Sequence, residues 1–196
     1  MPNANTISRY VGGNSPAQGA NVMPSITLVT TTEQFFPVQS GGTAILFPQP
    51  TPQVLAATAA PSFASGFDGL PFRVRAAFKA TTAGTSTIII NLYANQVGTT
   101  VVAGNKVATI TSQSLVTASA SGWLEATLIW DSIAKVLSGG QQGSFGTTVV
   151  TGNAALSNTA ISIPALANLN FALSATNGSS VVGNIVACTE FVIDAV

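Results

Sequence analysis

Three long segments of the chain alternate between apolar and polar side chains, and this period of two limits the fold more than any other feature of the sequence. The segments span residues 71–81, 123–131 and 184–196. Such alternation is typical of a β-strand that buries one face in a core and leaves the other at the surface. No segment keeps the helical period of about 3.6 over about ten residues, so we expect no helix beyond a single turn at 132–137.

The alternation assigns the residues of each segment to opposite faces. In the first segment, one face is expected to hold Phe72, Val74, Ala76 and Phe78, and the other Arg73, Arg75, Ala77 and Lys79. In the second, one face holds Leu124, Ala126, Leu128 and Trp130, opposed by Glu125, Thr127 and Asp131. In the third, one face holds Ile185, Ala187, Thr189, Phe191, Ile193 and Ala195, opposed by Cys188, Glu190 and Asp194.

Shorter β-type segments, rich in Thr, Val, Ile and Phe, occur from Ser25 onward between Gly and Pro residues. Together with the three segments they predict strands at 26–32, 34–38, 43–47, 72–81, 87–95, 106–112, 123–131, 147–151, 168–176 and 184–196. Many short strands separated by Gly-rich turns are typical of a sandwich or a barrel. About eight to ten strands in about 170 residues favour an antiparallel β-sandwich of jelly-roll type.

The chain divides into two parts by composition. Residues 1–24 are rich in Asn, Ser, Gly, Ala and Pro without a period, which predicts an extended N-terminal arm. Residues 25–196 are predicted to form the jelly-roll domain. Two long uncharged segments, 138–146 and 151–164, are expected to be loops. Their composition fits contacts with neighbouring subunits, and it fits mobile, uncovered loops equally well.

Charge is scarce, and this narrows the classes of partner. Lys and Arg total six, Asp and Glu total six, and the formal net charge is zero. A chain without an excess of basic residues has no electrostatic basis for binding nucleic acid or an anionic membrane surface. No apolar run approaches the ~18 residues of a spanning helix, and no signal peptide is evident at the N-terminus. Low charge and a mean hydropathy of +0.47 favour a protein whose surface is covered in an assembly.

Residues for catalysis are missing. The sequence has no histidine, which removes the commonest general base and metal ligand. Two carboxylate pairs remain, Glu125 with Asp131 and Glu190 with Asp194, but residues four or six apart on a strand lie ~13 or ~20 Å apart. The two catalytic carboxyl groups of a glycosidase lie ~5–9.5 Å apart. We expect no catalytic, cofactor-binding or metal-binding residues and no enzyme activity. Cys188, the single cysteine, is expected to be a small buried hydrophobe.

The aromatic and basic residues leave one alternative open. Core packing is expected for Phe72, Phe78, Trp130, Phe171 and Phe191. The less clearly buried Trp123 and Tyr93 are candidates for stacking on a sugar ring, with loop Asn residues as polar partners. This pattern keeps a carbohydrate-binding β-sandwich open. The three basic residues Arg73, Arg75 and Lys79 are interpreted as a solvated or salt-bridged strand face.

Several motifs after residue 68 resemble the strands of bacteriophage virion proteins. LPFRVR at 70–75 is similar to their strand that opens with an aromatic residue and alternates with Arg. GWLEATLIWDS at 122–132, followed by KVLSG at 135–139, is similar to their strand with a leading aromatic residue, Glu and Trp-Asp-Ser. GNIV at 183–186, followed by EFVI at 190–193, resembles their closing strand. The motifs occur in the same order, and the N-terminal third has no counterpart.

The resemblance implies a jelly-roll decoration or cement protein of a tailed phage. It would be a minor capsid protein assembled in the host bacterial cytoplasm and bound to the outer surface of the capsid in the virion. Such proteins bind the major capsid protein and stabilise the shell by clamping neighbouring subunits, and they typically form homotrimers. No functional residues are implied, since the shared motifs belong to the strand framework. The alternative is a phage fibre or spike protein that binds a host glycan.

Overall fold

The computed structural model describes residues 9–10, 25–29, 31–36, 71–94, 101, 103–116, 118–131, 136–153 and 171–195. These residues form antiparallel strands and one short 3₁₀ turn, η1 (Ala103–Asn105). The strands are β1 (Arg9–Tyr10), β2 (Ser25–Leu28), β3 (Gln34–Phe35), β4 (Pro71–Thr81), β5 (Ile88–Ala94), β6 (Lys106–Thr111), β7 (Ser119–Asp131), β8 (Val136–Phe145), β9 (Thr148–Asn153), β10 (Phe171–Asn177) and β11 (Asn184–Ala195). The predicted all-β antiparallel fold is confirmed.

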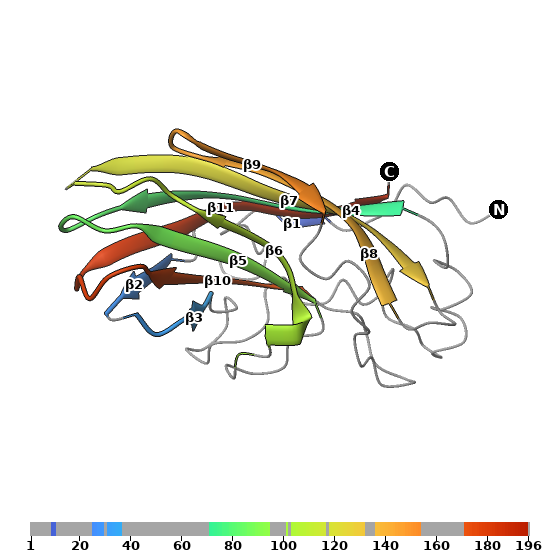
Figure 1. The fold of residues 1–196 in the computed structure, drawn as a ribbon, viewed down its shortest axis with the longest axis horizontal. Coiled ribbons are helices and arrows are strands. Elements are labelled where there is room, and N and C mark those ends of the chain that lie inside the picture. The colour runs from blue at the N-terminus through green and yellow to red at the C-terminus, as the bar shows by residue number, and fades with distance from the viewer. Residues whose placement is uncertain are drawn as a thin grey trace, which may run out of the picture.

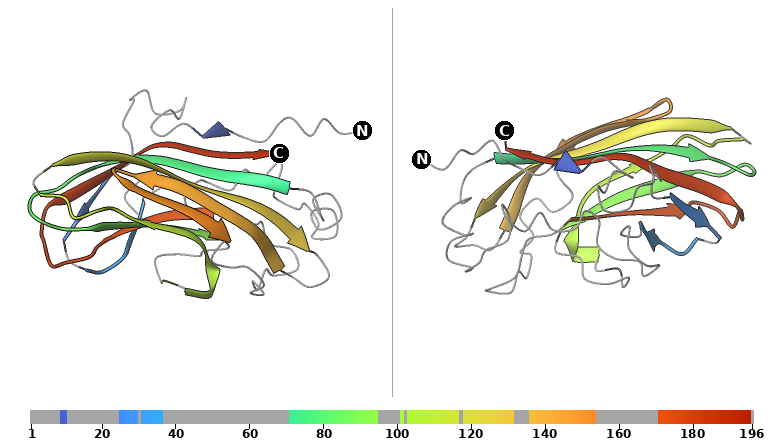
Figure 2. Two further views of the ribbon diagram at one scale, coloured as in Figure 1. Left: turned by 45° about the horizontal axis from the view of Figure 1, so that its top comes forward. Right: turned by 180° about the vertical axis from the view of Figure 1, so that it is seen from behind.

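The strands form two sheets that lie one over the other (Figure 1). The long sheet has seven strands in the order β1-β11-β4-β7-β8-β9, with β2 also paired to β11. The short sheet has four strands in the order β3-β10-β5-β6. Two further views show the same layers and place β1 beside β11 (Figure 2). The molecule is therefore a β-sandwich.

The order of the strands is that of a jelly roll. The part β2-β11-β4-β7 of the long sheet faces β3-β10-β5-β6 of the short sheet, so the chain passes between sheets at β2–β3, β4–β5, β6–β7 and β10–β11. This alternation makes two interleaved Greek keys, which define the jelly roll. The β8–β9 hairpin extends the long sheet beyond β7. The jelly-roll prediction is thus confirmed at the level of strand order.

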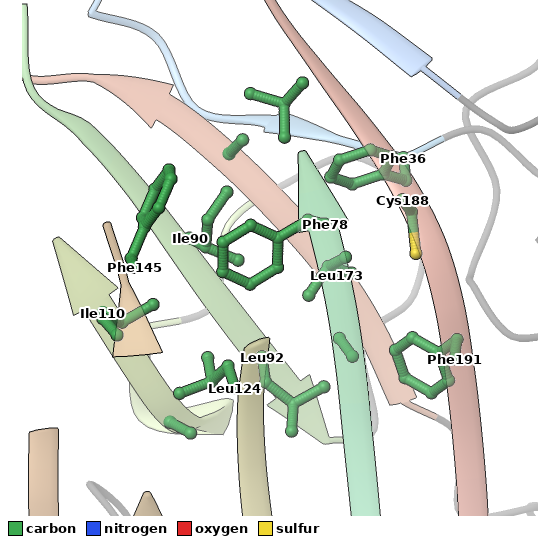
Figure 3. Packing of buried hydrophobic residues seen from close by; sticks show 14 of the residues in the cluster. Phe36, Phe78, Ile90, Leu92, Ile110, Leu124, Phe145, Leu173, Cys188 and Phe191 are labelled. Carbon is green, nitrogen blue, oxygen red and sulfur yellow. The ribbon is translucent and has the colours of Figure 1, made fainter. Parts of the chain in front are cut away.

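The core lies between the two sheets and is made by the inward residues of the alternating strands. Val74, Ala76 and Phe78 of β4 are buried, as predicted, together with Leu124, Ala126 and Leu128 of β7. Figure 3 shows these strands packing against Ile90, Leu92 and Leu173 of the short sheet. The Phe78 and Phe145 rings meet edge to face, with their centroids 4.9 Å apart. Phe191 is also buried as predicted, whereas the side chains of Phe72, Trp130 and Phe171 lie outside those described.

The prediction of a loop at 138–146 was wrong, because most of this segment is strand β8. Its glycines permit close approach to β7 rather than marking a turn. A Cβ on Gly139 would lie 1.9 Å from the Thr127 carbonyl oxygen, and the φ of Gly139 is +155°. A Cβ on Gly143 would lie 2.6 Å from the Trp123 carbonyl oxygen. The actual turn is short and lies at Gly146, where φ is +61°.

The predicted faces of β11 were wrong in its first half because a β-bulge changes the phase of the strand. The register with β4 shifts between Cys188 and Glu190. Before the bulge, Val186 and Cys188 point into the core and Ile185 is exposed. After the bulge, Phe191 points inward, as strict alternation from the C-terminal end requires. The two-residue period of the sequence cannot show where one strand carries an extra residue.

Several predicted strands were longer than those observed. The predicted strand 26–32 ends at Leu28 in β2, and the predicted strand 34–38 is reduced to β3. The predicted strand 43–47 lies outside the described residues, as does most of the predicted arm at 1–24 and of the loop at 151–164. Within the arm, Arg9 and Tyr10 pair with Val192 and Phe191. No helix in the described part of the chain is long and apolar enough to span a membrane.

Candidate interface at the loop end of the sandwich

Five connections meet at one end of the sandwich, on the left in Figure 1. They are β2–β3, β4–β5, β6–β7, β8–β9 and β10–β11. We call this surface the loop end and define it by residues 29, 31–33, 82–87, 112–116, 118, 146–147 and 178–183. Its residues are almost all Thr, Ser, Gly, Ala and Val, and Glu33 is its one charged residue. The loop end is therefore a surface of short connections with one charged residue, Glu33.

Apolar side chains are exposed at the loop end. Val116 is 65% exposed on β6–β7, Val182 is 66% exposed on β10–β11, and Val29 is 47% exposed on β2–β3. Ile185 is 44% exposed at the start of β11, directly after the loop. Single exposed apolar residues are ordinary on a protein surface, but their presence on several loops of one end makes the loop end a candidate contact surface.

Side-chain amides tie β4–β5 to β10–β11. The Ala83 N–H donates to Asn184 Oδ1 at 2.8 Å, and Asn184 Nδ2 donates to Asn177 Oδ1 at 2.9 Å. Asn177 Nδ2 in turn donates to the Val181 carbonyl at 2.7 Å. Asn177 and Asn184 are both buried. These amide bonds add to the backbone hydrogen bond that the Gly178 N–H donates to the Thr87 carbonyl at 2.9 Å.

Hydroxyl groups and backbone bonds join the remaining loops. The Thr82 Oγ1 accepts from Ala118 N–H at 3.0 Å, and a β-bridge links Ser86 to Leu115. The Gln113 Oε1 accepts from the Thr147 N–H at 3.1 Å, which fastens the β8–β9 turn to β6–β7. Each of these three connections, β4–β5, β6–β7 and β8–β9, is thus bonded to another.

The β2–β3 loop is joined to β10–β11 in the same way. The Gly183 N–H donates to the Leu28 carbonyl at 3.1 Å, so Val29 and Val182 directly flank a bonded pair. Gly178 allows the close approach of β10–β11 to β4–β5, since a Cβ there would lie 1.9 Å from Thr87 Oγ1. Because its loops are cross-bonded, the loop end is held in one shape before any partner arrives, which lowers the entropy cost of binding.

The residues predicted for sugar stacking do not come together. Tyr93 lies on the outer side of the short sheet and is fully buried. Trp123 lies on the outer side of the long sheet, and the Arg75 guanidinium sits over its ring at 5.3 Å from the centroid. The two rings therefore face opposite sides of the sandwich. The prediction that Tyr93 is available for stacking was wrong.

Tyr93 is buried in a polar cluster that sequence reasoning missed. Glu33 accepts hydrogen bonds from Asn91 Nδ2 at 2.8 Å, from the Tyr93 hydroxyl at 3.1 Å and from the Ser174 hydroxyl. Burial, and then the charge and hydrogen bond of Glu33, raise the pKa of Tyr93 above its ordinary value of 10.0. The cluster fastens the β2–β3 loop to β5 and β10. The one feature of the sequence that could have indicated this cluster is Glu33, an isolated acidic residue directly before β3.

The carboxylates of β7 and β11 belong to the framework of the long sheet. Glu125 points outward as predicted, yet it is only 5% exposed. Its Oε2 lies 3.8 Å from Arg73 Nε, and its Oε1 accepts from Gln142 Nε2 at 2.8 Å. Arg73 therefore belongs to a salt-bridged strand face, which is one of the two interpretations that the sequence left open. The side chains of Asp131 and Asp194 lie outside those described, so neither predicted pair is measured.

The described residues offer no group of three His, Cys, Asp or Glu side chains for a metal ion. Cys188 is buried, as predicted, and its thiol donates to the Glu190 carbonyl at 3.3 Å. Burial raises the pKa of Cys188 from 9.0 to about 12, so the thiol stays protonated and unreactive at neutral pH. Lys79 is exposed on the outer side of β4, consistent with a solvated strand face.

Comparison with known proteins gives no family. No protein-family model matches the chain. No curated protein matches it either. Among solved structures, it is similar to a winged bean acidic lectin in complex with methyl-α-D-galactose, with 12% sequence identity and a TM-score of 0.38 over 98% of this chain and 93% of the lectin. A TM-score this low supports no inference about sugar binding.

Proposed function

We propose that this chain is a structural protein of a bacteriophage virion that binds the outer surface of the capsid through its loop end and stabilises the shell. The observation that carries the proposal is the loop end itself, a surface with one charged residue and with exposed Val29, Val116 and Val182 on cross-bonded loops. A protein contact surface that buries few charges avoids their desolvation cost. The parts of the proposal that name a phage and its capsid rest on the motif resemblance described above.

A rigid loop end suits a decoration protein for a physical reason. Many copies bind equivalent positions on one shell, so each contact has to form in the same geometry. Side-chain amides and hydroxyls already fix the loops at 2.7–3.1 Å hydrogen bonds such as those of Asn177, Asn184 and Thr82. A chain that binds the assembled shell but not its separate subunits stabilises the assembled shell by mass action.

The test uses heads of the phage that encodes the chain, purified without it. The double variant Val116→Asp and Val182→Asp places two carboxylates on the loop end, where Val116 and Val182 are 65% and 66% exposed. We expect the affinity for heads to fall at least about tenfold, since a charge buried without a partner at a contact costs over ~1.4 kcal/mol.

The matched control is Val101→Asp, because Val101 is 41% exposed and lies between β5 and β6 at the other end of the sandwich. This variant should bind heads like the unmodified chain. Equal loss of binding in both variants, or unchanged binding of the double variant, would overturn the role of the loop end. Circular dichroism confirms that each variant is folded.

The glycan-binding alternative has lost one of its two rings, because Tyr93 is buried on the sheet opposite Trp123. The structural role is therefore the function that we propose.

A further inference from the structure

The two edges of the long sheet differ in how they are covered. At one edge, β11 is paired along much of its length by β2 and β1. At the other edge lies β9, whose one partner among the described strands is β8 (Figure 1). An edge strand presents a row of backbone N–H and C=O groups that can pair with another strand.

The register shows which groups of β9 point to the free edge. The Gly146 N–H donates to the Ser121 carbonyl at 3.1 Å, so the backbone of Phe145 is turned away from β7 and toward its partner Thr148. In an antiparallel pair, bonded and non-bonded positions alternate. Val149, opposite Ser144, is therefore a non-bonded position with respect to β8. The N–H groups of Val149 and Thr151 point away from the sheet.

Strand β9 lacks the features by which proteins usually block an edge. Its six residues, TVVTGN, include no Lys, no other charge and no Pro. No register shift interrupts its pairing with β8, so the edge is not twisted away by a bulge. Val149 is 70% exposed, the highest value among the large apolar residues described. Natural edge strands of this kind are usually paired or covered.

The edge of the short sheet offers a contrast within the same molecule. Strand β6 is at that edge, and its Thr109 N–H donates to Gln141 Oε1 of β8 at 2.9 Å. A side chain from the facing sheet thus caps a backbone group at this edge. The described residues show no such cap along β9.

We propose that β9 pairs antiparallel with β9 of a second copy of this chain about a two-fold axis. The pairing joins two seven-stranded long sheets into one continuous sheet. Because β9 is uncharged, its identical partner brings no like charges opposite one another. The zero net charge of the chain likewise removes repulsion between copies. A two-fold contact is closed, so it ends at a dimer and forms no open fibre. This dimer differs from the homotrimer that the motif resemblance implies.

The test uses the purified chain alone, so its result is independent of binding to phage heads. Sedimentation equilibrium from micromolar concentrations upward should show a monomer–dimer equilibrium. Val149→Pro removes an outward N–H without removing a β8–β9 bond, and should weaken dimerisation at least about tenfold. Val149→Thr is the matched control: it keeps the N–H and should dimerise like the unmodified chain.

Amide hydrogen exchange supplies a measurement that needs no variant. The amides of Val149 and Thr151 should exchange at least about tenfold more slowly in the dimer than in dilute monomer. The amide of Val150, bonded to β8, should be protected at both concentrations. A chain that stays monomeric, a dimer in which Val149 and Thr151 remain unprotected, or equal loss of dimer in both Val149 variants would each overturn the proposal.

Discussion

At the residue scale, Glu33 holds the β2–β3 loop against the short sheet. Its carboxylate accepts from Asn91 and Tyr93 of β5 and from Ser174 of β10. Replacing Glu33 with Ala leaves three buried or half-buried donors without their acceptor. We expect Glu33→Ala to lower the free energy of unfolding by ~2–4 kcal/mol.

Urea unfolding measures this loss, and Glu33→Gln is the control. The amide of Gln keeps one acceptor oxygen and loses the charge, so its effect should be smaller than that of Ala. Equal stability of Glu33→Ala and the unmodified chain would show that the three donors find other partners at no cost.

Cys188 is expected to make the folded chain less stable as the pH rises through the alkaline range. Burial raises the pKa of its thiol from 9.0 to about 12. Between these values the unfolded chain releases the proton while the folded chain keeps it, so the stability present below pH 9 is lost as pH rises toward 12. We expect the free energy of unfolding to fall by up to ~1.4 kcal/mol per pH unit from this group.

The measurement compares urea unfolding at about pH 8 and about pH 10, in reducing buffer, for the unmodified chain and for Cys188→Ala. The variant cannot release this proton, so its stability should decline less over the same interval. The same decline in both proteins would assign the alkaline effect to other groups.

At the element scale, strand β8 depends on glycine where it approaches β7. A Cβ on Gly139 would lie 1.9 Å from the Thr127 carbonyl oxygen, at a φ of +155°. We expect Gly139→Ala to lower the free energy of unfolding by ~2–4 kcal/mol because the strands must separate or the backbone must strain. Gly104→Ala is the control, since a Cβ there meets nothing within 4 Å. Thermal unfolding should separate the two, and equal melting temperatures would contradict the close approach of β8.

The sequence predicted well those strands whose buried face follows from uninterrupted alternation of apolar residues within the strand itself. Val74, Ala76 and Phe78 alternate without interruption, and so do Leu124, Ala126 and Leu128, and all six are buried. Strand β8 was missed because Gly139 and Gly143 are there to fit β7, which a one-strand pattern cannot reveal. The faces of β11 were misassigned at a bulge that only the pairing with β4 shows.

The candidate interface was not predictable from the sequence. Val29, Val116 and Val182 lie far apart in the chain and are ordinary β-strand residues, so no local pattern sets them apart. They share a surface because the jelly-roll order brings their loops to one end. The low charge of the sequence predicted that part of the surface is covered in an assembly, but it did not show which part. Tyr93 was misjudged for a related reason, since its partner Glu33 comes from a different strand pair.

At the scale of the whole molecule, the segment 1–24 is proposed to act as an arm that adds to the contact with the shell. Its Arg9 and Tyr10 already pair with β11. We expect deletion of residues 1–24 to leave the sandwich folded and to reduce the affinity for heads, because a second tethered contact raises the overall affinity. Circular dichroism and head binding measure the two effects. Unchanged binding of the truncated chain would remove the arm from the account.

The molecule has a jelly-roll framework, a cross-bonded loop end with one charged residue, and a strand β9 that pairs only with β8 among the described strands. The loop end is proposed to face the shell, and the β9 edge a second copy of the chain. These two surfaces involve different residues, so variants at Val116 and Val182 test one and variants at Val149 test the other. Independent failure of either would leave the other standing.

The central claim is that the chain coats the outside of a phage head. Its most direct test is to mix the purified chain with heads of the phage that encodes it, prepared without it, and to measure the amount that sediments with the heads as its concentration rises. We expect binding that saturates at a fixed ratio of this chain to the shell protein. No sedimentation with heads, or binding that increases without saturation, would contradict it.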